Sequence, residues 1–153
     1  MLDERLLGLP CDWFAAVQEE ITTACYVYTE NQGFVRSDKL SETMLNIISR
    51  QMLTNPELTL LGNAVNKGLN LKNAQAQLII GEFDEATILS VTKQQNILVL
   101  LGDTMNSIDC RMHDVAKYNE AMVLRTLEMA KVLSFPENKR IFWKDLQQII
   151  PLL

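Results

Sequence analysis

The run Ile97-Leu98-Val99-Leu100-Leu101 constrains the fold more than any other segment, because all five of its residues are apolar. A strand with one solvated face alternates between apolar and polar residues, whereas a strand that is apolar throughout is covered on both faces. A polar stretch, residues 93–96, precedes the run and has the composition of a turn. We therefore expect a strand here, in the middle of a sheet.

Other segments predict further strands around this central one. Residues 24–29 are rich in side chains that fit a pleated surface, and residues 34–36 follow after the turn-forming Asn31-Gln32-Gly33. This pattern predicts a hairpin. Residues 74–80 begin with an alternating pattern, and residues 86–92 are rich in β-branched side chains. Together with the central run, these segments predict five strands.

Apolar residues spaced three or four apart predict the helices. The first runs over residues 12–23, with Asp12 as a possible N-cap. The second covers residues 39–68 and should kink or restart at Pro56, because proline removes a backbone donor. The third begins near Asn106, and since residues 104–135 contain no glycine or proline, it could continue for about eight turns.

Composition excludes several classes of protein. The chain has 153 residues, which suits a single domain spanning residues 1–153, with a core at about 12–132 and a helical extension at about 136–153. A formal net charge of −5 argues against binding nucleic acid, which requires clustered basic side chains. No segment has the length of a membrane span or the pattern of a secretory signal. These features predict a cytoplasmic protein.

The sequence offers no recognisable catalytic or cofactor-binding motif. Cys110 and the only histidine, His113, are spaced as Cys-x-x-His, but no second ligand pair is present and nothing in the sequence orients the imidazole as a base. The acidic pair at Glu19 and Glu20 is expected to face water. No glycine pattern matches a phosphate-binding loop. We therefore expect a protein that is not an enzyme and has no cofactor or metal.

The resulting order, α-β-β-α-β-β-β-α, resembles the roadblock dynein light-chain family. The resemblance covers residues 12–132, with a first strand at Ala24-Cys25-Tyr26-Val27-Tyr28, a turn at Asn31-Gln32-Gly33-Phe34 and a last strand at Ile97-Leu98-Val99-Leu100-Leu101. It implies an α+β fold with a five-stranded antiparallel sheet. In that fold, a long middle helix lies on one face of the sheet and the terminal helices lie on the other.

The roadblock resemblance also implies partners. Members form homodimers that join their sheets edge to edge along the third strand, which corresponds here to Ala76, Leu78, Ile80 and Phe83. Some members regulate small Ras-like GTPases. The resemblance therefore implies a non-enzymatic dimeric scaffold or regulatory protein that binds and regulates a small GTPase.

Two interpretations remain open for other parts of the chain. The apolar residues of the C-terminal segment, Ile141, Phe142, Leu146 and Ile149, recur at helical spacing and could dock on their own domain or form a surface for a partner. The alternative function is a small-molecule sensor of the PAS or profilin-like type. In that case the strand face that carries Tyr26 and Tyr28 would line a pocket.

Overall fold

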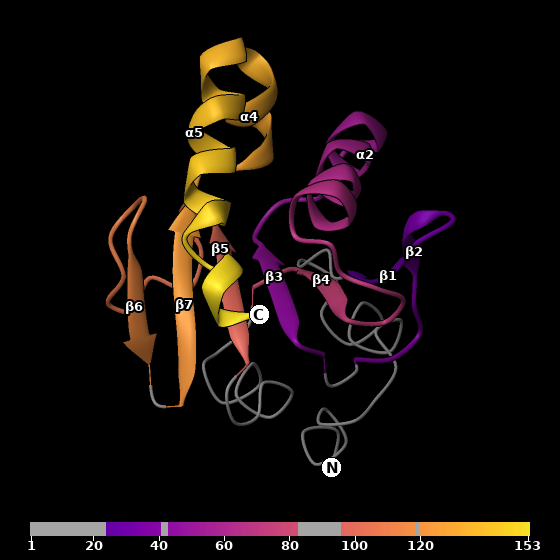
Figure 1. Cartoon of the computed structure of the whole chain (residues 1–153), viewed down its shortest axis with the longest axis horizontal. Coiled ribbons are helices and arrows are strands. Elements are labelled where there is room, and N and C mark those ends of the chain that lie inside the picture. The colour runs from indigo at the N-terminus through magenta and orange to yellow at the C-terminus, as the bar shows by residue number, and fades with distance from the viewer. Residues whose placement is uncertain (1–23, 41–42, 83–95, 119) are drawn as a thin grey trace.

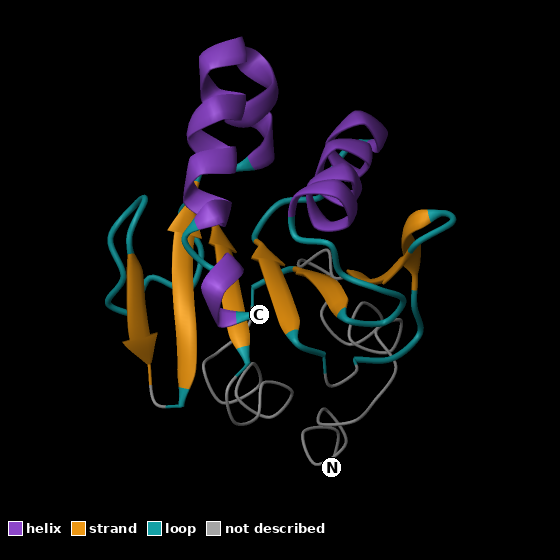
Figure 2. Cartoon of the chain, viewed as in Figure 1, coloured by secondary structure: helices purple, strands orange, loops and turns teal. Residues whose placement is uncertain are grey.

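The computed structural model describes residues 24–40, 43–82, 96–118 and 120–153, and its centre is a mixed sheet of seven strands (Figures 1 and 2). The strands lie in the order β2-β1-β4-β3-β5-β7-β6. Their bounds are β1 Ala24–Thr29, β2 Gly33–Arg36, β3 Leu45–Ser49, β4 Ala76–Ile80, β5 Ile97–Leu101, β6 Val115–Tyr118 and β7 Ala121–Thr126.

The four central strands of the sheet are parallel. β3 pairs in parallel with β4 and with β5, and β5 pairs in parallel with β7. The outer pairs, β1 with β2, β1 with β4 and β6 with β7, are antiparallel. The fold class is therefore α+β as expected, but the prediction of a five-stranded antiparallel sheet is wrong.

The helices that the structure describes cover one face of the sheet, where they stand beside one another in Figure 1. They are α2 Asn55–Asn63, which continues into a π-helical segment at Ala64–Gly68, then α4 Met129–Ser134, α5 Pro136–Gln147 and a final 3₁₀ turn at Ile150–Leu152. The prediction of a middle helix and terminal helices on opposite faces does not hold for these helices, because α2 and α5 contribute to the same hydrophobic core.

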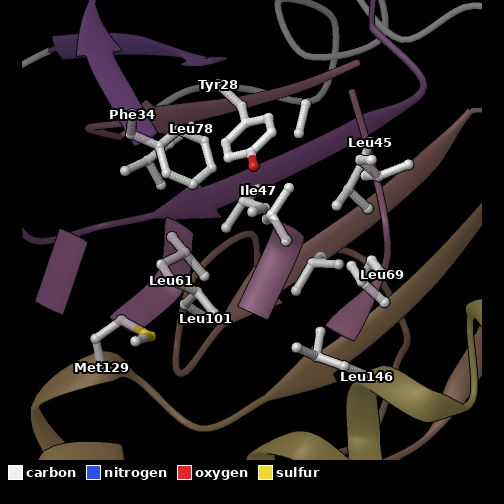
Figure 3. Close-up of a cluster of buried hydrophobic side chains, with 14 of the residues drawn as sticks. Tyr28, Phe34, Leu45, Ile47, Leu61, Leu69, Leu78, Leu101, Met129 and Leu146 are labelled. Carbon is white, nitrogen blue, oxygen red and sulfur yellow. The ribbon is translucent and has the colours of Figure 1, made fainter. Parts of the chain in front are cut away.

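Side chains of the central strands are buried on both faces of the sheet. On β3, Ile47 faces the cluster under the helices (Figure 3), and Ile48 belongs to a second cluster on the opposite face. On β5, Val99 belongs to the cluster under the helices and Leu100 to the cluster on the opposite face. Every residue of β5 is buried, and the strand is paired on both sides, so the prediction of a central strand at this run is confirmed.

The start of the segment predicted to be the second helix contains a strand instead. Residues 45–49 form β3, and all five are buried between β4 and β5. The periodicity of such a short apolar run does not distinguish the stripe of a helix from a fully buried strand. The helix begins only after Thr54, whose Oγ1 accepts the N–H of Glu57 while Glu57 Oε1 accepts the N–H of Thr54.

The predicted third helix is also wrong. The chain from residue 106 instead forms a loop, then the β6–β7 hairpin, and only α4 is helical. Lack of glycine and proline permitted a helix there but did not require one. On β7, Val123, Leu124 and Thr126 are fully buried, so packing in the sheet outweighs intrinsic helix propensity.

Other predictions are confirmed or lie outside the described residues. β1 and β2 form the expected hairpin, with Val27 opposite Val35. The predicted first helix at 12–23 and the predicted strand at 86–92 fall outside the described residues. Among the helices that the structure describes, none combines the length and the apolar character needed to span a membrane.

Candidate functional site

An apolar groove separates α2 and its π-helical extension from α5. It has a volume of about 330 Å³. The apolar side chains in its lining are Leu60, Ala64, Val132, Phe142 and Trp143, and the polar ones are Asn63, Lys67 and Lys139. Grooves of this size that are mainly apolar are a common form of binding site in proteins.

Each wall of the groove is a stripe of residues at helical spacing, and the two stripes come from distant parts of the sequence. Leu60, Ala64 and Gly68 lie four residues apart on one side of α2 and the π-helical segment. On α5, Lys139 and Trp143 are related by the same interval. The two stripes face each other because α5 packs against the π-helical segment.

The closest approach across the groove is between Gly68 and Trp143. A Cβ atom placed on Gly68 would overlap the six-membered ring of the Trp143 indole, with Cζ3 as the nearest atom. Glycine at this position therefore allows the indole to lie directly against the π-helical backbone. The amide of Leu69 donates to the carbonyl of Ala64 at 3.0 Å, which closes the π-helical turn at the same place.

Polar contacts on the far side of α5 fix this wall of the groove. The carboxyl group of Asp145 is almost fully buried, and its Oδ2 accepts the hydroxyl proton of Thr126 at 2.6 Å. The same oxygen lies 2.7 Å from Nδ1 of His113. Gln148 Nε2 donates to the backbone carbonyl of His113 at 2.9 Å. These bonds attach α5 to β7 and to the loop before β6, so one wall is held independently of any ligand.

His113 is held in an uncommon backbone conformation at this anchor. Its φ is +71°, and its amide donates to the carbonyl of Arg125 at 2.7 Å. The side chain is 43% exposed, so the imidazole is oriented by Asp145 but open to solvent. Cys110, the other half of the Cys-x-x-His spacing, has a buried thiol that donates to backbone carbonyls, including that of Asp114 at 3.3 Å. Burial raises the pKa of this thiol, which opposes a role as a nucleophile.

A second candidate region is the carboxyl edge of the parallel strands, where open sheets of this kind often bind ligands. Arg50 follows β3, and its Nε donates to Oε1 of Glu82 at 2.8 Å, while Nη1 lies 4.0 Å from Oδ2 of Asp103. Hollows of about 270 and 310 Å³ flank this arginine. All three side chains are more than half exposed, so the ion pairs are weak.

The chemistry of this carboxyl edge does not define a ligand. Among the described residues that line its hollows, Arg50 is the one basic side chain, against the acidic Glu57, Glu82, Asp103 and Glu128. That excess of negative charge disfavours an anion. No group of three or more potential metal ligands is found within the described residues.

Comparison with known proteins does not assign the chain to a family. No protein-family model matches the sequence, and no curated protein is significantly similar to it. The geometry of the chain itself is therefore the basis for the function proposed below.

The structure places the residues predicted for dimer formation inside the sheet. Ala76, Leu78 and Ile80 belong to β4, which is paired with β1 on one side and β3 on the other. Both edges of β4 are therefore occupied and cannot accept a strand from a second copy. Phe83 lies outside the described residues.

The residues predicted as a partner surface divide into two groups. Phe142, Leu146 and Ile149 are buried in the core, whereas Ile141 is 38% exposed on the outer side of α5. Tyr28, predicted to line a pocket in the sensor alternative, is buried against α2 in the cluster of Figure 3 and reaches the wall of another hollow.

Sequence reasoning missed the groove itself. One wall is a stripe of residues four apart, Leu60, Ala64 and Gly68, beside the stripe of the same helix that faces the core. On α5, Lys139 and Trp143 form a similar second stripe. Each stripe could have been found by its period. The sequence could not show that the two stripes face each other, because this depends on how the strands between α2 and α5 are ordered in the sheet.

Proposed function

We propose that this protein is a non-enzymatic binding module that recognises an amphipathic segment of another protein in the groove between α2 and α5. The observation that supports this proposal best is the chemistry of the groove. Its walls are apolar, and the two charged side chains among the described residues that line it, Lys67 and Lys139, are basic. The partner should therefore present apolar anchor residues flanked by Asp or Glu.

Charge supports this choice of partner. The whole chain has a formal net charge of −5, yet none of the described residues that line the groove is acidic. A local basic rim on an acidic protein attracts acidic segments and repels basic ones, and this selectivity weakens as salt screens the charges. An apolar floor with a charged rim is typical of grooves that bind amphipathic helices.

Further exposed apolar side chains lie on the α4–α5 hairpin, which forms one wall of the groove. Leu133 and Ile141 are 36% and 38% exposed, and Phe135, between α4 and α5, is 58% exposed. Exposed large apolar side chains are more frequent at interaction surfaces than elsewhere on a protein surface. They offer contacts to a partner that extends beyond the groove.

The small GTPase implied by the roadblock resemblance is not part of this proposal. That partner was implied by the roadblock resemblance, which also implied a five-stranded antiparallel sheet, whereas the sheet found here has seven strands with a parallel centre. The proposal retains a regulatory protein that binds another protein. It replaces the sheet edge with the helical face as the binding surface.

The test uses Trp143 as its own reporter in a Trp13→Phe background, since the chain has two tryptophans. The probes are two helical peptides of about 18 residues with the same leucine stripe, one flanked by glutamates and one by lysines. We expect saturable binding with a shift in Trp143 emission, and about fivefold tighter binding of the acidic peptide at low salt. The Lys67→Glu/Lys139→Glu protein should prefer the lysine peptide.

The matched control is Lys117→Glu, an exposed change on β6 at the far edge of the sheet, which should leave the preference unchanged. Absence of saturable binding to either peptide, or equal binding of both, would overturn the proposal. Light scattering completes the test. If the protein forms a dimer that Ala64→Arg dissociates, the occupant of the groove is a second copy, and the proposal of a different partner fails.

A further inference from the structure

A separate hollow lies between the turn of the β1–β2 hairpin and the outer face of α2. Its volume is about 420 Å³, within the range of about 300 to 1,000 Å³ usual for small-molecule sites. Of the described residues, Asn63 alone lines both this hollow and the apolar groove. The two sites can therefore be tested independently.

The helical wall of this hollow is made of uncharged hydrogen-bonding side chains. Asn55, Thr59, Asn63 and Asn66 follow one another at intervals of four, four and three residues, which places them on one face of α2 and the π-helical segment. Each amide offers donors and an acceptor on adjacent atoms, and the hydroxyl offers both. Within the described part of the chain, these four side chains make no hydrogen bond to the protein.

The opposite wall is the hairpin turn, which adds the side chains of Asn31 and Gln32. Gly33 completes this turn with a φ of +71°. The two walls meet at Gly62, where an added Cβ would lie 3.6 Å from Cα of Gly33. The hollow is therefore closed at its base, with amide groups on both sides.

The base of the hollow is apolar. Leu58 is the partly exposed apolar side chain there, whereas Phe34 and Tyr28 are 8% and 1% exposed and contribute little accessible surface. The rings of Tyr28 and Phe34 pack edge to face with centroids 5.6 Å apart. A ligand in this hollow would rest an apolar surface on the base and direct polar groups toward both walls.

Charge narrows the class of ligand. No described residue in the lining is basic, and the one acidic residue, Glu30, has Nζ of Lys72 at 3.5 Å from its carboxylate. Phosphate groups are usually bound by arginine or lysine, and Ca²⁺ by several carboxylates. A neutral ligand with many hydroxyl groups fits this lining better than either.

We propose that this hollow binds a neutral saccharide. Neighbouring hydroxyl groups on a sugar ring alternate as donors and acceptors at the spacing that a side-chain amide can bridge, and the C–H groups of the ring supply an apolar surface for the base. The site goes beyond the protein-binding function proposed above and does not depend on it.

The test is ligand-observed saturation-transfer NMR followed by titration calorimetry. The probes are D-glucose, D-galactose, D-mannose and N-acetyl-D-glucosamine, with N-acetylalanine methylamide as a mimic of a peptide main chain. We expect at least one sugar to bind with a dissociation constant on the order of 1 mM or tighter. Thr59→Val and Asn66→Ala should each weaken that binding about fivefold. Neither residue lines the apolar groove.

Asn106→Ala is the control, because Asn106 is an exposed amide at the carboxyl edge of the sheet and lies outside the hollow. It should leave binding unchanged, and thermal unfolding should show that all three variants remain folded. Absence of saturable binding by every sugar, or binding that Thr59→Val and Asn66→Ala leave intact, would overturn the proposal. Preference for the blocked amino acid would overturn the ligand class.

Discussion

Tyr28 is buried in the core, and its hydroxyl group has no hydrogen-bond partner among the residues that the structure describes. The residue is 1% exposed, and its hydroxyl oxygen points toward Ile47 among the apolar side chains of Figure 3. An unsatisfied buried hydroxyl costs free energy that phenylalanine would avoid. We expect Tyr28→Phe to raise the free energy of unfolding by about 1 kcal/mol in urea denaturation.

The control for this change is Tyr26→Phe, two residues earlier on β1 and only partly buried. It should have little effect on the free energy of unfolding. A loss of stability in Tyr28→Phe would contradict the prediction and would mean that a water molecule satisfies the hydroxyl group.

At the scale of elements, Arg125 holds the loop between β5 and β6 in place. Its guanidinium is buried and donates to backbone carbonyls of Gly102, Thr104, Met105 and Cys110 at distances between 2.6 and 3.2 Å. Lysine cannot reproduce this planar set of donors. We expect Arg125→Lys to lower the free energy of unfolding by about 3 kcal/mol, as measured by urea denaturation.

The exposed Arg111 in the same loop provides the comparison, and Arg111→Lys should have almost no effect. Equal effects of the two substitutions would show that the carbonyl contacts of Arg125 do not stabilise the loop. Hydrogen exchange of the amides of Ile108 and Cys110, which bond within the loop, would locate the change.

The elements also show what the sequence could and could not predict. The hairpin and β5 were predictable because turn chemistry and a fully apolar run are local signals. β3 was not, because a buried parallel strand of five residues leaves no period that excludes a helix. β7 was not predictable either, because its strand state depends on pairing with β5, which is a non-local contact. The groove was not predictable for the same reason, because the contact between its two helical walls is also non-local.

For the molecule as a whole, the buried hydroxyl group of Tyr28 and the buried thiol of Cys110 predict how stability changes at alkaline pH. Burial is the main cause of the raised pKa values of Tyr28 and Cys110, with the charges of Glu30 and Asp114 acting in the same direction. Arg125 opposes the shift at Cys110. The folded protein therefore retains both protons at a pH where the unfolded chain has lost them.

Below the pKa values that these groups have in the unfolded chain, they should not change the free energy of unfolding with pH. Above about pH 9 the free energy of unfolding should fall, because the unfolded state then binds fewer protons than the folded state. The free energy of unfolding, measured by urea denaturation between pH 7 and about 10.5, should decline at the alkaline end. The decline should be smaller in Cys110→Ala and in Tyr28→Phe than in the parent protein. If both variants follow the parent curve, other groups cause the alkaline loss, and burial of these two side chains does not link protonation to folding.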